Sequence, residues 1–122
     1  MKRSLMLTLV FLMGAPLSTH AQSSKDAVAV DPTHHHVIME NDRVRVFEVL
    51  AKPGDKSPMH THPPLVAVSL TKARLRVTTP DGKSSIFDLN PAQALWMENV
   101  QHSWELLAGE VHIIAVEVKA GR

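Results

Sequence analysis

The stretch PGDKSPMHTH, residues 53–62, carries the clearest structural signal in this sequence. It places a turn before an extended segment in which two histidines stand one residue apart. Alternate side chains of a β-strand share a face, so His60 and His62 can direct both imidazole rings at one point. A third histidine, His102, follows forty residues later inside an apolar run. The pattern predicts a single metal site on the strands of a small β-barrel.

The first 21 residues resemble a secretory signal peptide. Lys2 and Arg3 give a positive start, and the segment from Leu5 to Met13 is apolar except for Thr8. Thr19-His20-Ala21 supplies a small-residue cleavage site. The apolar segment is shorter than the roughly 20 residues that a membrane-spanning helix needs. We therefore expect removal of residues 1–21 near Ala21, a secreted or periplasmic protein, and no stable membrane anchor.

The remaining composition restricts the classes of partner. Removing 21 of the 122 residues leaves 101, which suffices for one domain with one core. Loss of Lys2 and Arg3 leaves 11 of the 13 basic residues against 12 acidic ones, a formal charge of −1. This balance predicts no basic patch and hence no nucleic-acid partner. Cysteine is absent, which excludes disulfides and a thiolate nucleophile.

Alternating apolar runs and turn signals predict an all-β domain over residues 34–119. Residues 22–33 are small and polar without a sustained period, and we interpret them as a flexible lead-in. Pro80-Asp81-Gly82-Lys83 predicts a hairpin turn between two β-rich segments. No segment long enough for a helix remains. The predicted strands are residues 36–40, 43–51, 59–62, 65–71, 74–79, 84–88, 94–97, 102–107 and 111–119.

Residues 34–119 resemble a single-domain cupin, a family of small jelly-roll β-barrels. The first cupin motif has a glycine, five further residues and then His-x-His, which Gly54, His60 and His62 match. The second motif supplies one more histidine from a later strand, and His102 stands at that place. The resemblance implies a cupin-type jelly-roll β-barrel with His60, His62 and His102 as metal ligands. It also implies a homodimer, because cupins often pair their barrels edge to edge, which covers exposed strand edges.

The usual glutamate ligand of the family is missing from the first motif, where Val66 or Ala67 stands instead. In the second motif only His102 matches chemically. Glu98, in the turn before His102, remains a candidate for the missing carboxylate, whereas Glu105 has the parity of an outward-facing residue. The resemblance therefore implies a three-histidine site. Without a charged ligand the metal's 2+ charge is not offset, and we expect an anion in an open position.

The chemistry of such a site leaves its function open. Neutral imidazole binds several divalent transition metals, and iron, zinc, manganese, nickel and copper all remain candidates. A bound water would become acidic, or a bound substrate polarised. One interpretation is a metal-dependent oxidoreductase acting on a small molecule, since three-histidine iron sites occur in cupin-related thiol dioxygenases. The alternatives are a non-catalytic module for a metal or small molecule and a metal-free structural cupin. No residue stands out as a positioned acid or base.

Two further groups of histidines have mainly structural interpretations. The tract His34-His35-His36 lies between the lead-in and the first strand, and we interpret it as solvated surface. An adventitious metal site there is the alternative. His112 shares parity with the apolar residues Ile114 and Val116 of the last predicted strand. We therefore expect His112 to face the barrel interior as a supporting group rather than as a ligand.

Arginines and aromatic residues can also be assigned to faces by parity. Arg43 and Arg45 alternate with valines, which predicts a polar outer face. The alternative is an inward-facing arginine that anchors a substrate carboxylate through paired hydrogen bonds. Trp104 and Leu106 share the parity of His102 and are expected to line the pocket behind the metal. Such a pocket favours a small, partly apolar ligand.

Overall fold

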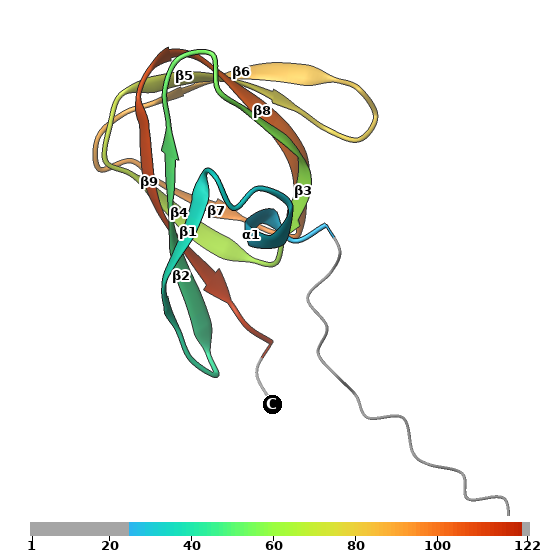
Figure 1. Ribbon diagram of the computed structural model, residues 1–122, viewed down its shortest axis with the longest axis vertical. Helices are drawn as coiled ribbons and strands as arrows, with labels where there is room; N and C mark the ends of the chain where they lie inside the picture. The colour runs from blue at the N-terminus through green and yellow to red at the C-terminus, as the bar shows by residue number, and fades with distance from the viewer. Residues whose placement is uncertain (1–24, 121–122) are drawn as a thin grey trace, which may run out of the picture.

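The chain folds into a barrel of two antiparallel β-sheets, which Figure 1 shows curving around a common interior. The computed structural model describes residues 25–120, so the predicted signal peptide lies outside the described residues. One sheet has the strand order β1-β2-β9-β4-β7, and the other has the order β3-β8-β5-β6. The elements are α1 (Ala27–Val30), β1 (His35–Glu40), β2 (Val44–Ala51), β3 (Lys56–His62), β4 (Leu65–Ser69), β5 (Ala73–Thr78), β6 (Ser84–Leu89), β7 (Ala94–Met97), β8 (Val100–Gly109) and β9 (Val111–Val118).

The nine predicted strands are all present, and the all-β fold is confirmed. β7 has the predicted bounds, and most other ends move by one or two residues. The larger difference is in β3, which begins at Lys56 rather than at Met59. Its pairing with β8 shifts register between Ser57 and His60, and such a bulge breaks the alternation by which a strand is recognised. The hairpin is confirmed: the Thr79 amide donates to the Lys83 carbonyl over 3.0 Å, and Gly82 has φ +83°.

The core lies between the two sheets and is built from alternate residues of their strands. Phe47 of β2, Leu65 of β4 and Leu106 of β8 are almost completely buried. This alternation follows from the two-residue period of a strand, which turns successive side chains to opposite faces. On β2 and β9 the same inward rows also contain the buried charged residues Arg45 and Glu117. The interior of the barrel is therefore not purely apolar.

The inward row of β9 corrects the expectation for His112. The buried residues of this strand are Val111, Ala115 and Glu117, which have the opposite parity to His112. The side chain of His112 is 39% exposed, and its Nε2 lies 3.1 Å from Glu48 Oε2. The prediction that His112 faces the barrel interior is wrong. Both faces of β9 carry apolar residues, so the alternation alone does not show which face is buried. An assignment shifted by one residue places every side chain on the opposite face.

The segment before β1 differs from the expected flexible lead-in. Its described part begins at Lys25, whose carbonyl accepts a 2.7 Å hydrogen bond from the Thr61 amide. Asp26 caps the short helix α1 by accepting from the Ala29 amide over 3.2 Å, and Ala27 is completely buried. Figure 1 places α1 against the barrel, beside β3. No helix within residues 25–120 is long and apolar enough to span a membrane.

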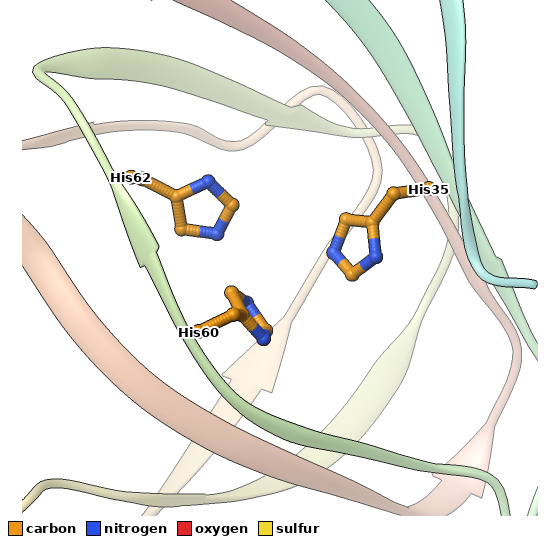
Figure 2. Close-up of side chains that lie close together, drawn as sticks. All are labelled: His35, His60 and His62. Carbon is orange, nitrogen blue, oxygen red and sulfur yellow. The ribbon is translucent and has the colours of Figure 1, made fainter. Parts of the chain in front are cut away.

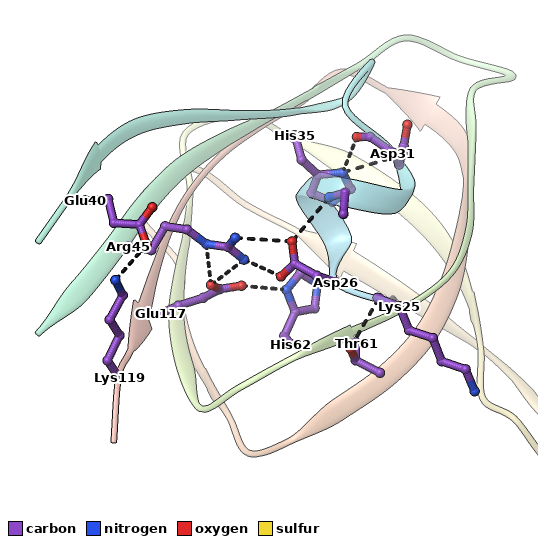
Figure 3. A network of polar contacts seen from close by, with 11 residues as sticks. Lys25, Asp26, Asp31, His35, Glu40, Arg45, Thr61, His62, Glu117 and Lys119 are labelled. Carbon is purple, nitrogen blue, oxygen red and sulfur yellow. Dashed lines mark hydrogen bonds and ion pairs between the residues drawn. The ribbon is translucent and has the colours of Figure 1, made fainter. Parts of the chain in front are cut away.

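Arg45 explains why this segment is ordered. Its side chain is only 4% exposed, so the expected outer position is wrong for Arg45, although Arg43 is exposed as predicted. The Arg45 guanidinium donates to Glu117 over 2.8 Å and forms an ion pair with Asp26 (Figure 3). Burial alone would raise the pKa of Asp26, but the guanidinium lowers it below its usual value. A buried charge needs such partners, and residue 26 supplies one of them.

Replacing Asp26 with alanine is expected to destabilise the protein markedly. The variant removes one partner of a buried cation and the cap of α1, which together cost about 2 to 4 kcal/mol of unfolding free energy. Urea denaturation measures this loss. Asp88→Ala is the control, because Asp88 pairs with Arg74 at the surface and its loss should change stability little. Equal stability of the two variants would contradict the structural role of the buried pair.

Candidate metal centre

Four histidine rings gather inside the barrel, on three different strands. His60 and His62 come from β3, His102 from β8 and His35 from the first position of β1. The ring centroids of His60 and His62 are 4.8 Å apart, those of His60 and His102 also 4.8 Å, and those of His62 and His102 5.3 Å. His60 and His102 are cross-strand partners in the β3–β8 ladder. The structure therefore brings together the three rings that were predicted as ligands, while their binding of a metal stays a prediction.

His35 is the member of the cluster that the sequence interpretation missed. It is 2% exposed, and its ring centroid lies 5.0 Å from that of His60. One ring nitrogen from each of His35, His60 and His62 lies within 4.8 Å of the others, and Figure 2 shows the three rings around a shared space. The interpretation of residues 34–36 as solvated surface is wrong for His35 and holds for His36, which is exposed. The remaining residues of β1 are exposed, so no alternation marks His35 as buried.

The outer nitrogen of three of these rings is held by an acceptor. The Nδ1 atom of His35 lies 3.0 Å from the Asp31 carbonyl oxygen, and that of His60 lies 2.7 Å from the Pro58 carbonyl oxygen. His62 Nδ1 lies 3.3 Å from a carboxylate oxygen of Glu117. Carbonyl and carboxylate oxygens only accept, so each Nδ1 carries a hydrogen, and in the neutral form of a ring its Nε2 keeps the lone pair. This is how proteins orient metal-ligating histidines.

The separation of His60 and His102 tests whether one ion would fit. Their Nε2 atoms are 3.1 Å apart. Metal–nitrogen bonds of about 2.0 to 2.1 Å place adjacent ligand nitrogens of one ion about 2.8 to 3.4 Å apart, from octahedral to tetrahedral angles. The observed distance falls in this interval. This pair of nitrogens, which are hydrogen-bonded to each other, therefore also has the spacing of two ligands of one ion.

Burial keeps His35, His60 and His102 uncharged. Burial, followed by the nearby His62, lowers the pKa of His60 to about 4. Burial and then His60 lower the pKa of His102 to about 3, and burial also lowers the pKa of His35. At neutral pH these rings are therefore in the neutral form that binds metals.

The carboxylate beside the cluster is Glu117 of β9, which is 2% exposed. It contacts His62 through one oxygen and Arg45 through the other, and Arg45 continues the network to Asp26 (Figure 3). Glu98, the candidate replacement for the missing glutamate, is exposed and accepts a 3.2 Å hydrogen bond from Trp96. Glu105 pairs with Arg76 on the outer side, as its parity predicted. Glu117 is therefore the carboxylate that holds His62, and the sequence prediction does not include it.

A cavity of about 140 Å³ adjoins the histidine cluster. Three of its lining residues are the histidines His35, His62 and His102, and Trp104 lines it as expected from parity. The remaining lining residues are all apolar, among them Ala67 and Ala115. Ala67, and not Val66, thus faces the interior at the place of the missing glutamate. The cluster can therefore present a bound ion to a small apolar space.

Comparison with solved structures identifies the fold. A cupin domain from Bordetella pertussis Tohama I has 29% sequence identity, covers 70% of this chain and 92% of its own, and has a TM-score of 0.64. A cupin-2 domain containing protein from Shewanella frigidimarina has 17% identity over 70% of this chain and 79% of its own, with a TM-score of 0.50. An RmlC-like cupin with a double-stranded β-helix fold from Methanocaldococcus jannaschii has 13% identity over 69% of this chain and 77% of its own, with a TM-score of 0.55. No protein-family model and no curated protein matches the chain.

The hydrogen bonds of the cluster predict the proton positions of its rings. At pH 7 in the metal-free protein, His35 and His60 should each carry their single proton on Nδ1, because each Nδ1 faces an oxygen acceptor. Two-bond proton–nitrogen correlation spectra of the imidazole rings measure this directly. A proton on Nε2 of His35 or of His60 would contradict the described orientation. The exposed His36 provides the internal reference for a ring without buried partners.

Proposed function

We propose that this chain, a small cupin by fold, is an exported protein that holds one divalent transition metal on its buried histidines and offers it to a small molecule. The observation that carries the proposal is the orientation of His35, His60 and His62. Each has its Nδ1 beside an oxygen acceptor, and Nε2 of His60 faces Nε2 of His102 at 3.1 Å. A cluster of neutral imidazoles that only packed together would not need this common orientation.

The proposed ligand set is His60, His62 and His102, with His35 as an additional ligand. The first three match the cupin resemblance, and the 3.1 Å separation of the His60 and His102 nitrogens suits a shared ion. His35 adds a donor from β1, with a ring nitrogen within 4.8 Å of one on His60 and one on His62. The candidate metals are iron, zinc, nickel and copper, which suit imidazole nitrogen, and manganese, which favours oxygen ligands. Glu117 acts on His62 from outside the ligand set and, being held by Arg45, keeps that ring in place.

We propose a metal-dependent oxidoreductase, of the dioxygenase kind, as the catalytic form of this function. The supporting observation is the lining of the cavity. Among the described residues that line it, none has a carboxylate or hydroxyl side chain that could serve as an acid or a base. When bound, a metal would supply substrate binding and redox chemistry that this lining lacks. The chain's own residues would hold the ion, exclude water through the apolar walls and orient the substrate. Non-catalytic binding, or a metal-free structural role, is the alternative.

Export and dimerisation complete the proposal. Removal of residues 1–21 would take away no residue of the described fold, which begins at Lys25. Secretion or transfer to the periplasm therefore leaves the contact of Lys25 with Thr61 intact. The edge strands β1 and β6 carry the exposed apolar residues Val37, Ile38, Met39, Ile86 and Phe87, which supports pairing with a second copy.

Metal analysis of the protein, produced without a histidine tag, tests the proposed function. We expect one ion per chain, and loss of the ion in the His60→Ala/His62→Ala double variant. Single His102→Ala and His35→Ala variants should each lower zinc affinity by about tenfold or more, since each removes a donor. The controls are His36→Ala and His112→Ala, which alter histidines outside the cluster.

Two results would contradict the proposal. A native protein that binds zinc no more tightly than the double variant has no metal site at this cluster. Equal losses of affinity in the His112→Ala control and in the cluster variants would place the ion at the surface. Oxygen consumption by the iron-loaded protein over a panel of small molecules then distinguishes the oxidoreductase from a binding module.

A further inference from the structure

The cavity beside the histidines exists because two facing residues are alanines. Ala67 of β4 and Ala115 of β9 are direct cross-strand partners, and both line the cavity. They are 8% and 2% exposed, so each methyl group is turned into the interior. Leucine, phenylalanine and other larger apolar side chains form most of the remaining wall. Any longer side chain at position 67 or 115 would occupy the space in front of the rings.

The size of this space limits what it can hold. A buried apolar cavity of about 150 Å³ accommodates a molecule of the size of benzene. The cavity of this chain, at about 140 Å³, has the same scale. One of its lining residues, Phe87, is 47% exposed. A ligand with a body of about one ring can therefore fit without displacing the core.

The charges around the cavity are already paired with one another. Arg45 lies between Asp26 and Glu117, and none of the three lines the cavity. Within residues 25–120, no buried side-chain nitrogen or oxygen lacks a hydrogen-bond partner. An inward arginine is thus present, but it is not free to anchor a substrate carboxylate. A ligand's ammonium group would likewise find no free carboxylate, and burial of an unpaired charge is costly.

We infer that the site takes a small molecule with a ring-sized apolar body and one anionic or acidic donor group, and that it rejects zwitterions such as amino acids. The apolar body lies against Ala67 and Ala115, and the donor group lies toward His35, His62 and His102. This inference rests on the proposed function for the metal that would meet the donor group. Neutral ligand imidazoles leave the ion's positive charge to be balanced by an anion, which supports a single anionic group.

Three probes that differ by one feature test the inference on the zinc-loaded full chain. Phenylacetate has both the ring and the carboxylate, acetate lacks the ring, and phenylglycine adds an ammonium group. Calorimetric titration should show phenylacetate binding at least about tenfold more tightly than acetate, because the ring leaves water for the apolar cavity. The affinity for phenylacetate should also exceed the affinity for phenylglycine by about tenfold or more, because the ammonium group has no partner in the cavity. Equal affinity for phenylacetate and either other probe would overturn the inference.

An Ala67→Leu variant tests the location of the ring. The larger side chain should fill the cavity and weaken phenylacetate binding by about tenfold, with zinc content unchanged. Val66→Leu is the matched control, since Val66 neighbours Ala67 on the same strand but does not line the cavity. Circular dichroism checks that both variants fold, and Ala115→Val serves as a second, smaller filling. Undiminished binding in folded Ala67→Leu and Ala115→Val proteins would overturn the inference.

Zinc content is measured before each titration, which separates this inference from the proposed function. A protein without zinc contradicts the metal site itself. A protein with zinc that binds all three probes equally keeps the metal site and contradicts only the ligand class.

Discussion

Arg45 is a buried cation, and its charge has to be matched inside the barrel. Glu117 on β9 and Asp26 before α1 supply the two carboxylates. Through these contacts the guanidinium joins the N-terminal segment to two neighbouring strands of the larger sheet. Glu117 also holds the outer nitrogen of His62. The orientation of one ring in the candidate metal centre thus depends on this ion-pair network.

The same network explains the position of His35. The segment that Asp26 holds in place includes Asp31, whose carbonyl oxygen accepts from His35 Nδ1. β1 begins at His35, directly after this segment. The His35 ring lies in the cluster, while the other residues of the strand are exposed. A buried ion pair can contribute little net stability because of the cost of removing charge from water. In this protein the buried ion pair fixes the geometry of the neighbouring side chains, which a purely apolar contact would leave free to repack.

Sequence patterns predicted the β-strands well because alternation and turn chemistry are local properties. The β7 bounds and the hairpin at residues 80–83 needed no knowledge of distant contacts. The pair His60 and His62 followed from the same two-residue period, and His102 was identified through a family motif. By contrast, parity failed on β9, where both rows are apolar enough to be buried, and His112 was assigned to the wrong face. Arg45 was misassigned because charge alone favours the outer face.

The remaining parts of the site depend on contacts between residues far apart in the sequence. Glu117 meets His62 across 55 positions, and Asp26 meets Arg45 across 19. Neither contact produces a periodic pattern in the sequence, and a buried arginine can be recognised only together with its two partners. His35 has the same difficulty, since it is an isolated inward residue at the beginning of an exposed edge strand. Local sequence therefore indicates which residue types could form a site, whereas the packing of the barrel determines which of them meet.

Placement of the carboxylate outside the ring cluster has a chemical consequence for the interior. In the cupin motif that this chain resembles, a glutamate would stand close to Ala67, where it would occupy the cavity and add a negative charge. Here the negative charge lies behind His62, as Glu117, and is shared with Arg45. Ala67 and Ala115 leave apolar space in front of the rings. The carboxylate still orients a histidine in this arrangement. It neither occupies the volume in front of the rings nor binds the metal and offsets its charge, and a small anionic ligand would need both that volume and that charge.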